Sequence, residues 1–399
     1  MAIMRVTHYQ FGATLLVVAA LTLGCDDSTS PPNSAVPTTG AIKITATTIG
    51  VDRAPPGYKV EVRLPWFSFG TNVDVPINGT ATVSELQSGD YLLTIFGLVP
   101  NCERDIASPR SVSVVGGSTT PVALNVTCVT PTQLAFVNGA DSDAEIYVVN
   151  SDGTGATRIT TQPGADVNPA WSPDGSRITF ASQRDGNLEI YVMSANGTNP
   201  VRLTNVAASD YRPAWSPDGA RIAFVSERDG NAEIYVMNAD GTNPTRLTSN
   251  DAKDSDPAWS PDGRKIAFVS GRDGNGEIYV MTPDGSGLTR LTFRDLPDAQ
   301  PVWSPDGTRI AFSGASSFGD AIYVMNADGS SLDLWLKPNG YNGSDPAWSA
   351  DGRKILFTAI YCGYYDYGEC PSIIQFARTD GIPYSLTTGD RPSEPTWRP

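Results

Sequence analysis

Short apolar runs separated by polar turns fill the C-terminal two-thirds of the chain. They recur with a period of 44 residues, as the spacing of Tyr147, Tyr191 and Tyr235 shows. One period holds four such runs: Pro257–Trp259, Lys265–Ser270, Glu277–Met281 and Leu288–Thr292. The runs are rich in strand-forming residues and nearly continuous rather than alternating, as in a sheet covered on both faces. Four strands in a repeat of this length predict one blade of a β-propeller, which must stack on its neighbours to bury its faces.

Counting the repeated strands predicts the number of blades. A strand of the Ile-Ala-Phe type and a strand ending in Pro-x-Trp each occur six times. The two sets are out of step at the ends: Leu134–Phe136 has no Pro-x-Trp strand before it, and Pro395–Trp397 has no Ile-Ala-Phe strand after it. We therefore predict an all-β fold with a six-bladed propeller over residues 131–399, in which the C-terminal strand completes the first blade. This closure removes the exposed edge of an open sheet.

The repeated pattern PxWSPDGxxIAFxS…EIYVMNADG…RLT resembles the TolB-like group of WD40-like propellers. One copy is carried by Pro213–Gly219, Ile222–Ser226, Glu233–Gly241 and Arg246–Thr248. The resemblance implies the propeller fold over residues 131–399. TolB itself carries a mixed α/β domain before its propeller and is soluble in the periplasm. The N-terminal third of this chain is different, so the role of TolB in the Tol–Pal system is not carried over.

The first 40 residues predict export and tethering. Arg5 precedes the apolar run Phe11–Gly24, which is too short to span a bilayer comfortably, and residues 1–25 therefore predict a signal peptide. Leu21–Cys25 resembles a bacterial lipobox, which implies that Cys25 becomes the lipidated first residue; an ordinary cleaved signal is the alternative. Residues 26–40 are polar and rich in proline, as expected of a disordered tether.

Residues 41–130 predict a small β-sandwich. Apolar and polar residues alternate over Lys59–Leu64, as in a half-buried strand. The expected strands are Ile42–Thr48, Lys59–Leu64, Thr80–Leu86, Tyr91–Phe96, Ser111–Val115 and Val122–Val126. The stretch Leu86–Cys102 resembles β-sandwich modules of the Ig-like or carboxypeptidase-regulatory kind. This resemblance implies a spacer that holds the propeller away from the membrane.

The numbers and positions of cysteine and histidine limit the disulfides, metal sites and catalytic mechanisms that the chain could have. If Cys25 carries lipid, four cysteines remain, and their spacing predicts the disulfides Cys102–Cys128 and Cys362–Cys370 in an oxidising compartment. A zinc site shared by both pairs is the rival interpretation. The single histidine, His8, lies in the signal, so Ser-His-Asp and Cys-His catalysis are excluded from the mature chain. Glycoside chemistry with two carboxylates remains open.

Acidic residues recur at fixed places in the repeat. The aspartates of the WSPDG turns and the acids of the Arg-Asp-Gly-Asn loops are predicted turn formers, with calcium binding as the alternative for the loops. A further set lies on the Pro-x-Trp strands, three residues before the proline: Asp166, Asp210, Asp254 and Asp298. Just before the proline come Asn168, Arg212, Asp256, Gln300, Asp345 and Glu394. With these strands innermost, some of these side chains are expected to line the central channel or its mouth. The resulting acidic funnel could hold a cation such as Ca²⁺ or a basic peptide segment, or could be a solvated polar lining.

The largest break in the repeat is the insertion Tyr361–Cys370. It carries the tyrosines Tyr361, Tyr364, Tyr365 and Tyr367. Tyrosine buries area at low entropic cost, which is typical of recognition loops. The insertion lies between the second and third strands of its blade, on the same face as Tyr211, Arg212 and Tyr341, and we predict that this face binds the partner. The alternative is a loop that packs on its own blade.

The charge balance sets the class of partner. Lys and Arg total 28 against 43 Asp and Glu, a net charge of −15, which disfavours nucleic acid and anionic membrane surfaces. The sequence therefore predicts a monomeric, cofactor-free lipoprotein, anchored in the bacterial envelope and facing the periplasm or the cell surface. Its propeller is predicted to be a non-catalytic scaffold for a protein or glycan. A carbohydrate-active enzyme, hydrolase or lyase, is the alternative, and a purely structural envelope protein is a third interpretation.

Overall fold

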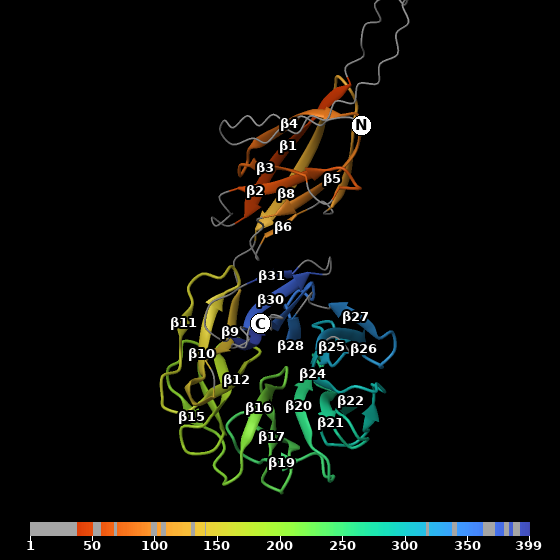
Figure 1. Ribbon diagram of the computed structural model, residues 1–399. Coiled ribbons are helices and arrows are strands. Elements are labelled where there is room, and N and C mark those ends of the chain that lie inside the picture. Colours follow the sequence, from red (N-terminus) through yellow and green to blue (C-terminus); the bar gives the residue numbers. More distant parts are fainter. Residues whose placement is uncertain are drawn as a thin grey trace, which may run out of the picture.

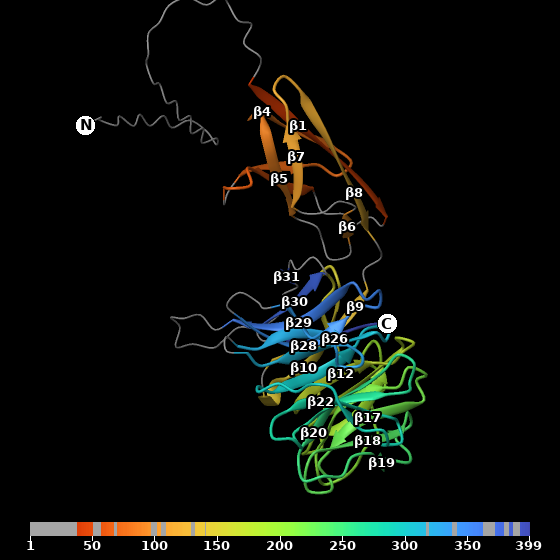
Figure 2. The same ribbon diagram turned by 90° about the vertical axis from the view of Figure 1, so that its right-hand side faces the viewer.

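The computed structural model describes residues 38–50, 57–67, 70–96, 102–104, 109–128, 132–139, 141–316, 319–336, 341–361, 372–378, 383–385 and 392–399. Within these ranges the chain forms β-strands and one 3-10 turn, η1 (Asp141–Asp143), without an α-helix. The all-β prediction is confirmed. In the part of the chain so described, no helix is long and apolar enough to cross a membrane. Figures 1 and 2 show two bodies of sheet, a small one built from the N-terminal strands and a large one built from the remainder.

The small body consists of two four-stranded sheets around one hydrophobic core. Its strands are β1 (Thr39–Gly50), β2 (Tyr58–Arg63), β3 (Thr71–Val75), β4 (Thr80–Gln87), β5 (Gly89–Phe96), β6 (Cys102–Arg104), β7 (Arg110–Val114) and β8 (Thr119–Cys128). The sheet orders are β4-β1-β8-β6 and β3-β2-β5-β7, with β1 and β8 parallel. Side chains from both sheets, among them Ile44, Leu93 and Leu124, share the core. Strands β3 and β6 were not predicted because one carries Asn and Asp and the other spans only three residues.

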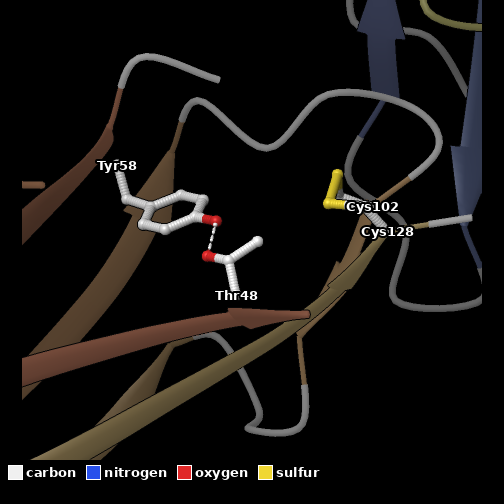
Figure 3. The surroundings of a disulfide bond; sticks show 4 residues. All are labelled: Thr48, Tyr58, Cys102 and Cys128. Carbon is white, nitrogen blue, oxygen red and sulfur yellow. Dashed lines mark hydrogen bonds between the residues drawn. A yellow bond between two sulfur atoms is a disulfide. The ribbon is translucent and has the colours of Figure 1, made fainter. Parts of the chain in front are cut away.

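A disulfide closes one edge of the small body. Cys102 and Cys128 lie opposite each other on β6 and β8 and are bonded, as the pairing predicted from sequence requires. Figure 3 shows this bond beside the hydrogen bond between Thr48 Oγ1 and Tyr58 Oη, at 2.6 Å. The bond fixes the very short β6 to the edge of its sheet. The second predicted pair, Cys362 and Cys370, lies outside the described residues.

The large body is a ring of six four-stranded antiparallel sheets. The first blade has β9 (Gln133–Asn138), β10 (Glu145–Asn150), β11 (Thr157–Arg158) and β32 (Ser393–Trp397); the second has β12 (Asp166–Trp171), β13 (Arg177–Ser182), β14 (Glu189–Ser194) and β15 (Val201–Arg202); the third has β16 (Asp210–Trp215), β17 (Arg221–Ser226), β18 (Glu233–Asn238) and β19 (Thr245–Arg246). The fourth has β20 (Asp254–Trp259), β21 (Ile266–Ser270), β22 (Glu277–Met281) and β23 (Thr289–Arg290); the fifth has β24 (Asp298–Trp303), β25 (Arg309–Gly314), β26 (Ala321–Asn326) and β27 (Asp333–Leu336); the sixth has β28 (Tyr341–Trp348), β29 (Lys354–Tyr361), β30 (Ser372–Arg378) and β31 (Pro383–Ser385). In Figure 1 the Pro-x-Trp strands β12, β16, β20, β24 and β28 lie nearest the middle of the ring.

The first and last strands of the propeller meet in one sheet. Strand β32 pairs antiparallel with β9, with Thr396 opposite Ala135 and Trp397 opposite Leu134. The backbone N–H of Arg398 also donates to the carbonyl of Gln133 at 2.9 Å. The C-terminal strand is therefore the innermost strand of the first blade, in the order β11-β10-β9-β32.

The core lies between the blades rather than within one. Side chains of adjacent blades share each cluster: Ala181 and Ile190 of the second blade pack with Trp215 and Phe224 of the third. The guanidinium of Arg177 lies 4.7 Å from the centre of the Trp215 ring, which adds a cation–π contact across the same joint. This sharing explains why the apolar runs are continuous, because both faces of each sheet are covered.

Candidate functional site

The innermost strands carry a repeated backbone irregularity. In each, the pairing register shifts just before the proline, as between Val167 and Ala170 in β12. The residue before the proline is in the left-handed region, with φ from 51° to 56°, at Asn168, Arg212, Asp256, Gln300, Asp345 and Glu394. This conformation is uncommon for any residue other than glycine, and a following proline disfavours the alternative helical region as well. Strained backbone of this kind costs on the order of 1–3 kcal/mol per residue and clusters at functional sites.

The six strained residues, named here the polar ring, line a central cavity. The cavity measures about 530 Å³. Most of its remaining wall consists of the residues that follow the polar ring on the same strands, mainly proline, alanine and tryptophan: Pro169, Ala170, Trp171, Pro213, Ala214, Trp215, Pro257, Ala258, Trp259, Pro301, Val302, Trp303, Pro346, Ala347, Pro395, Thr396 and Trp397. Pro173, Pro217 and Pro399, which lie beyond these strands, complete it. The site is therefore a channel lined by the polar ring and by an apolar wall. Its volume lies within the range of ligand pockets.

Neighbouring members of the polar ring contact one another across the blades. Both carboxylate oxygens of Glu394 accept from Asn168, from its backbone N–H at 2.5 Å and from its side-chain amide at 2.7 Å. Arg212 forms an ion pair with Asp256. Gln300 donates its side-chain amide to Asp345 and accepts the backbone N–H of Asp345 at 2.9 Å. These contacts tie strands of different blades together on the inner surface.

The polar ring has an excess of negative charge. It contains one cation, Arg212, and three carboxyl groups, Asp256, Asp345 and Glu394. Burial, together with the charge of nearby Asp345, raises the pKa of Glu394 to about 7. The charge on Arg212 acts in the opposite direction but does not offset these effects. The Glu394 carboxyl therefore changes its charge near neutral pH, unlike an ordinary surface glutamate.

Of the two predicted sets of residues, only the one just before the proline faces the channel. The aspartates three residues before the proline are fully buried and bound to arginines: Arg184 Nη2 lies 3.0 Å from Asp166 Oδ2, and Arg228 Nη2 lies 2.8 Å from Asp210 Oδ2. Arg272 binds Asp254 in the same way, whereas Asp298 is bound by Arg294, which precedes it by four residues. Of the side chains that could line the channel, these four aspartates do not, whereas the six just before the proline do. The four aspartates precede the bulge, where pairing is still regular, so their carboxylates are enclosed between strands.

The turn acids have structural partners. In the WSPDG turns the aspartate accepts from the preceding serine, as Asp174 does from Ser172 Oγ at 2.5 Å. In the Arg-Asp-Gly-Asn loops the acids bind arginine and tyrosine: Arg202 contacts Asp185 at 3.1 Å, and Tyr191 donates to the same carboxylate. The turn prediction is confirmed. Over the described ranges, no group of three or more His, Cys, Asp or Glu side chains is placed to hold a metal ion.

The predicted tyrosine face is described in part. Tyr211 Oη donates to Glu227 at 3.3 Å, and Arg212 belongs to the polar ring. Tyr341 and Tyr361 lie opposite each other in the pairing of β28 with β29. Tyr364, Tyr365 and Tyr367 lie outside the described residues, as does Cys25. The sequence predicted Arg212 both for this face and, with Asp345 and Glu394, for the set just before the proline that could line the channel. What it did not indicate is the left-handed backbone these residues share, because no glycine marks the position.

The propeller resembles known proteins in sequence and in fold. A family model described as the TolB beta propeller domain matches residues 130–211 and 201–364. Among solved structures, TolB from Acinetobacter baumannii is 22% identical, with a TM-score of 0.56 and 67% of each chain covered. The putative TolB from Agrobacterium tumefaciens is 24% identical, with a TM-score of 0.53, over 65% of this chain and 89% of that one. A comparison with curated protein sequences gives no match. At these identities the structural likeness shows the fold.

Proposed function

Because this chain belongs to the TolB β-propeller domain family, we propose that its propeller is a binding scaffold of the bacterial cell envelope whose central channel receives a partner. The partner is a protein, with a glycan as the alternative occupant. The scaffold itself carries out no reaction. Tol–Pal membership is not part of the proposal, because the small body of two sheets stands where TolB has a mixed α/β domain.

The observation that supports the proposal most is the polar ring. Six equivalent residues adopt a strained conformation, and their side chains differ at every blade except for the two aspartates. A structural repeat needs no such variety, whereas a site that recognises one orientation of a partner does. The blades around the ring are rigidly packed, which lowers the entropy that binding would cost.

The proposal also includes export of the chain and its anchoring to a membrane by lipid. Residues 1–25 carry the features of a lipoprotein signal, and lipid on Cys25 would hold the chain at a membrane. The polar residues 26–40 and the small body would then separate the channel from the membrane surface. The tyrosine-rich insertion Tyr361–Cys370 would border the channel on the side of the inter-blade connections and add contact area for the partner.

The test is affinity capture from an envelope extract of the source organism with three baits. The first is residues 26–399, the second has Tyr361–Cys370 replaced by a short turn, and the third has Ala258→Phe, which fills the channel from its apolar wall. A protein captured by the first bait and lost with the third supports the channel as the site. Equal capture by all three baits contradicts both the channel and the tyrosine loop. Selective release by glycosidase treatment would identify the occupant as a glycan.

One observation favours a second candidate function. A carboxyl with a pKa near 7 beside a second carboxyl is a common arrangement in glycoside chemistry, and Glu394 with Asp345 has that character. In this alternative Glu394 is a general acid in a carbohydrate-active enzyme. Release of reducing ends from a panel of envelope polysaccharides, abolished by Glu394→Gln, would establish it. Absence of turnover with every substrate leaves the binding scaffold as the better account.

A further inference from the structure

Hydrogen bonds and an ion pair connect some neighbouring members of the polar ring but not all of them. Contacts connect Glu394 to Asn168, Asn168 to Arg212, Arg212 to Asp256, and Gln300 to Asp345. Among the described contacts, none joins Asp345 to Glu394, although these two residues are neighbours on the adjacent innermost strands β28 and β32. The gap between them is the one place in the ring where two carboxyl groups adjoin.

We infer that the gap between Asp345 and Glu394 binds a cationic group of the partner, an ammonium or guanidinium at the end of a lysine or arginine side chain that enters the channel. This inference rests on the proposed function and names the chemistry recognised at that site. A cation there would give the two carboxylates a counter-charge in direct contact, whereas Arg212 acts on them only through a longer-range charge interaction. The ring's own cation, Arg212, is already paired with Asp256.

The existing hydrogen bonds leave room for this ligand. Asp345 accepts from Gln300 and from Ser344 Oγ, the latter at 2.9 Å, and Glu394 accepts twice from Asn168. A carboxylate offers about four acceptor positions, so both groups keep free lone pairs. Two carboxylates with three to five donors on the ligand match an ammonium or guanidinium. A divalent metal would ask for more oxygen ligands than two side chains provide.

The wall of the cavity suits the stem of such a side chain. Next to the two acids lie Pro346 and Ala347 on β28, and Pro395 and Thr396 on β32, all of which line the cavity. Lysine and arginine carry their charge on three or four methylene groups, which pack favourably on apolar surface while the charged end reaches a polar site. An anion or a neutral polar end would meet the same carboxylates without a compensating charge.

Binding of a cation here is linked to the protonation of Glu394. The charged groups facing that carboxyl are Asp345 on β28, Arg212 on β16 and Asp256 on β20. A bound cation favours the ionised carboxylate, so binding releases a proton when the pH lies below the pKa of free Glu394. Affinity for a cation should therefore rise as the pH increases through about 7.

The test measures binding of three short probes to the chain comprising residues 26–399. They are acetyl-Ala-Lys-Ala-amide, its arginine counterpart, and the norleucine peptide, which has the lysine stem without the charge. Binding is followed through the indole N–H signals in nuclear magnetic resonance spectra at physiological ionic strength. At about pH 8 we expect the cationic peptides to bind at least roughly tenfold more tightly than the norleucine peptide, and this preference to shrink at about pH 5.5.

Variants separate the proposed site from general attraction to an acidic protein. Glu394→Gln and Asp345→Asn should each abolish most of the cationic preference. Asp333→Asn, an exposed acid on β27, the outermost strand of its sheet, is the matched control and should keep it. Thermal unfolding of each variant checks that the propeller is intact, and at least one of the two ring variants must remain folded.

The outcomes test the cation site separately from the proposed binding function of the channel. Equal binding of lysine and norleucine peptides overturns the cation site and leaves the channel as a binding site. A lysine preference that persists in both ring variants overturns it as well, because the attraction then comes from elsewhere. If no peptide binds, the cation site is rejected, while the capture experiment with Ala258→Phe still decides whether the channel receives a partner.

Discussion

At the scale of single residues, the position before the proline keeps one backbone conformation in every blade while its side chain varies. The backbone is the same in all six blades, with φ close to 54°, whereas the residues are Asn, Arg, Asp, Gln, Asp and Glu. None is glycine, although glycine would adopt this conformation without strain. Asn and Asp tolerate this conformation better than other non-glycine residues, whereas Arg212, Gln300 and Glu394 are present in spite of its cost. Their chemistry, rather than the ease of forming the bulge, accounts for them.

Glu394 should make the stability of the propeller depend on pH. Its folded pKa of about 7 lies above the value of an unfolded glutamate, so the folded state binds the proton more tightly. Its contribution to the free energy of unfolding is therefore fully present below about pH 4.5 and is lost as the pH rises through about 7. Thermal unfolding from about pH 5 to about pH 8 should show a falling melting temperature that Glu394→Gln makes flatter. An unchanged slope in the variant would show that Glu394 does not titrate near 7.

At the scale of the element, a buried glutamate fastens the outer strands of four blades. In the third blade Glu233 accepts from Arg246 at 2.8 Å, from Thr248 Oγ1 at 2.5 Å and from the backbone N–H of Asn250 at 3.0 Å. Glu145, Glu189 and Glu277 hold the equivalent arginine and threonine. The fifth blade replaces this set with Ala321, Leu334 and Leu336. The short outermost strands are thus held by a charge network in four blades, and the fifth blade lacks the residue types that form it.

Removing one of these glutamates should be costly. Glu233 is fully buried, and Glu233→Ala removes the acceptor of the Thr248 hydroxyl and of the Asn250 N–H and leaves Asp229 as the remaining carboxylate partner of Arg246. Loss of one partner from a buried charge pair typically costs about 3–5 kcal/mol. Chemical denaturation should show a decrease of this size, against a negligible change for Asp251→Ala at an exposed loop acid. A loss below about 1 kcal/mol would mean that the network contributes little net stability.

The disulfide of the small body should matter at the same scale. It joins cysteines 26 residues apart, and a loop of this length contributes about 3 kcal/mol by restricting the unfolded chain. Replacing both cysteines by serine should lower the unfolding temperature of the small body and leave the propeller transition unchanged. Calorimetry of the whole chain, with the two transitions assigned, measures both. A shift in the propeller transition instead would show that the two bodies unfold together.

At the scale of the whole molecule, ring closure unites residues far apart in sequence. Strand β32 supplies the inner edge of the first blade, and Glu394 on it binds Asn168 on the second blade. Trp397 also packs against Leu134 and Phe136 and donates its indole N–H to the carbonyl of Ala347 at 3.2 Å. One short strand therefore joins the first, second and sixth blades.

Loss of the closing strand should disrupt the entire propeller. A chain ending at residue 391 lacks β32 and exposes the edge of β9 together with the apolar faces that Trp397 covers. Each large side chain uncovered costs about 1.5–3 kcal/mol, and an unpaired edge invites association. Size-exclusion chromatography and thermal unfolding should show aggregation or a broad transition. A chain ending at Trp397, which keeps β32 and loses only Arg398 and Pro399, is the control and should remain folded and elute like the full chain.

The sequence by itself determined the strands of the propeller, their period and the family. Continuous apolar runs between Pro-Asp-Gly turns specify strands covered on both faces, and the 44-residue spacing specifies blades, because these are local properties of the chain. It also placed Cys102 with Cys128. The composition of the channel was decided only by the tertiary structure. A bulge of one residue sends Asp345 and Glu394 into the cavity and leaves Asp166 and Asp210 enclosed beside arginines, although all four lie on equivalent strands. Since a shift of one residue reverses which face a side chain occupies, the pattern of acids alone could not distinguish ligand-facing carboxylates from structural ones.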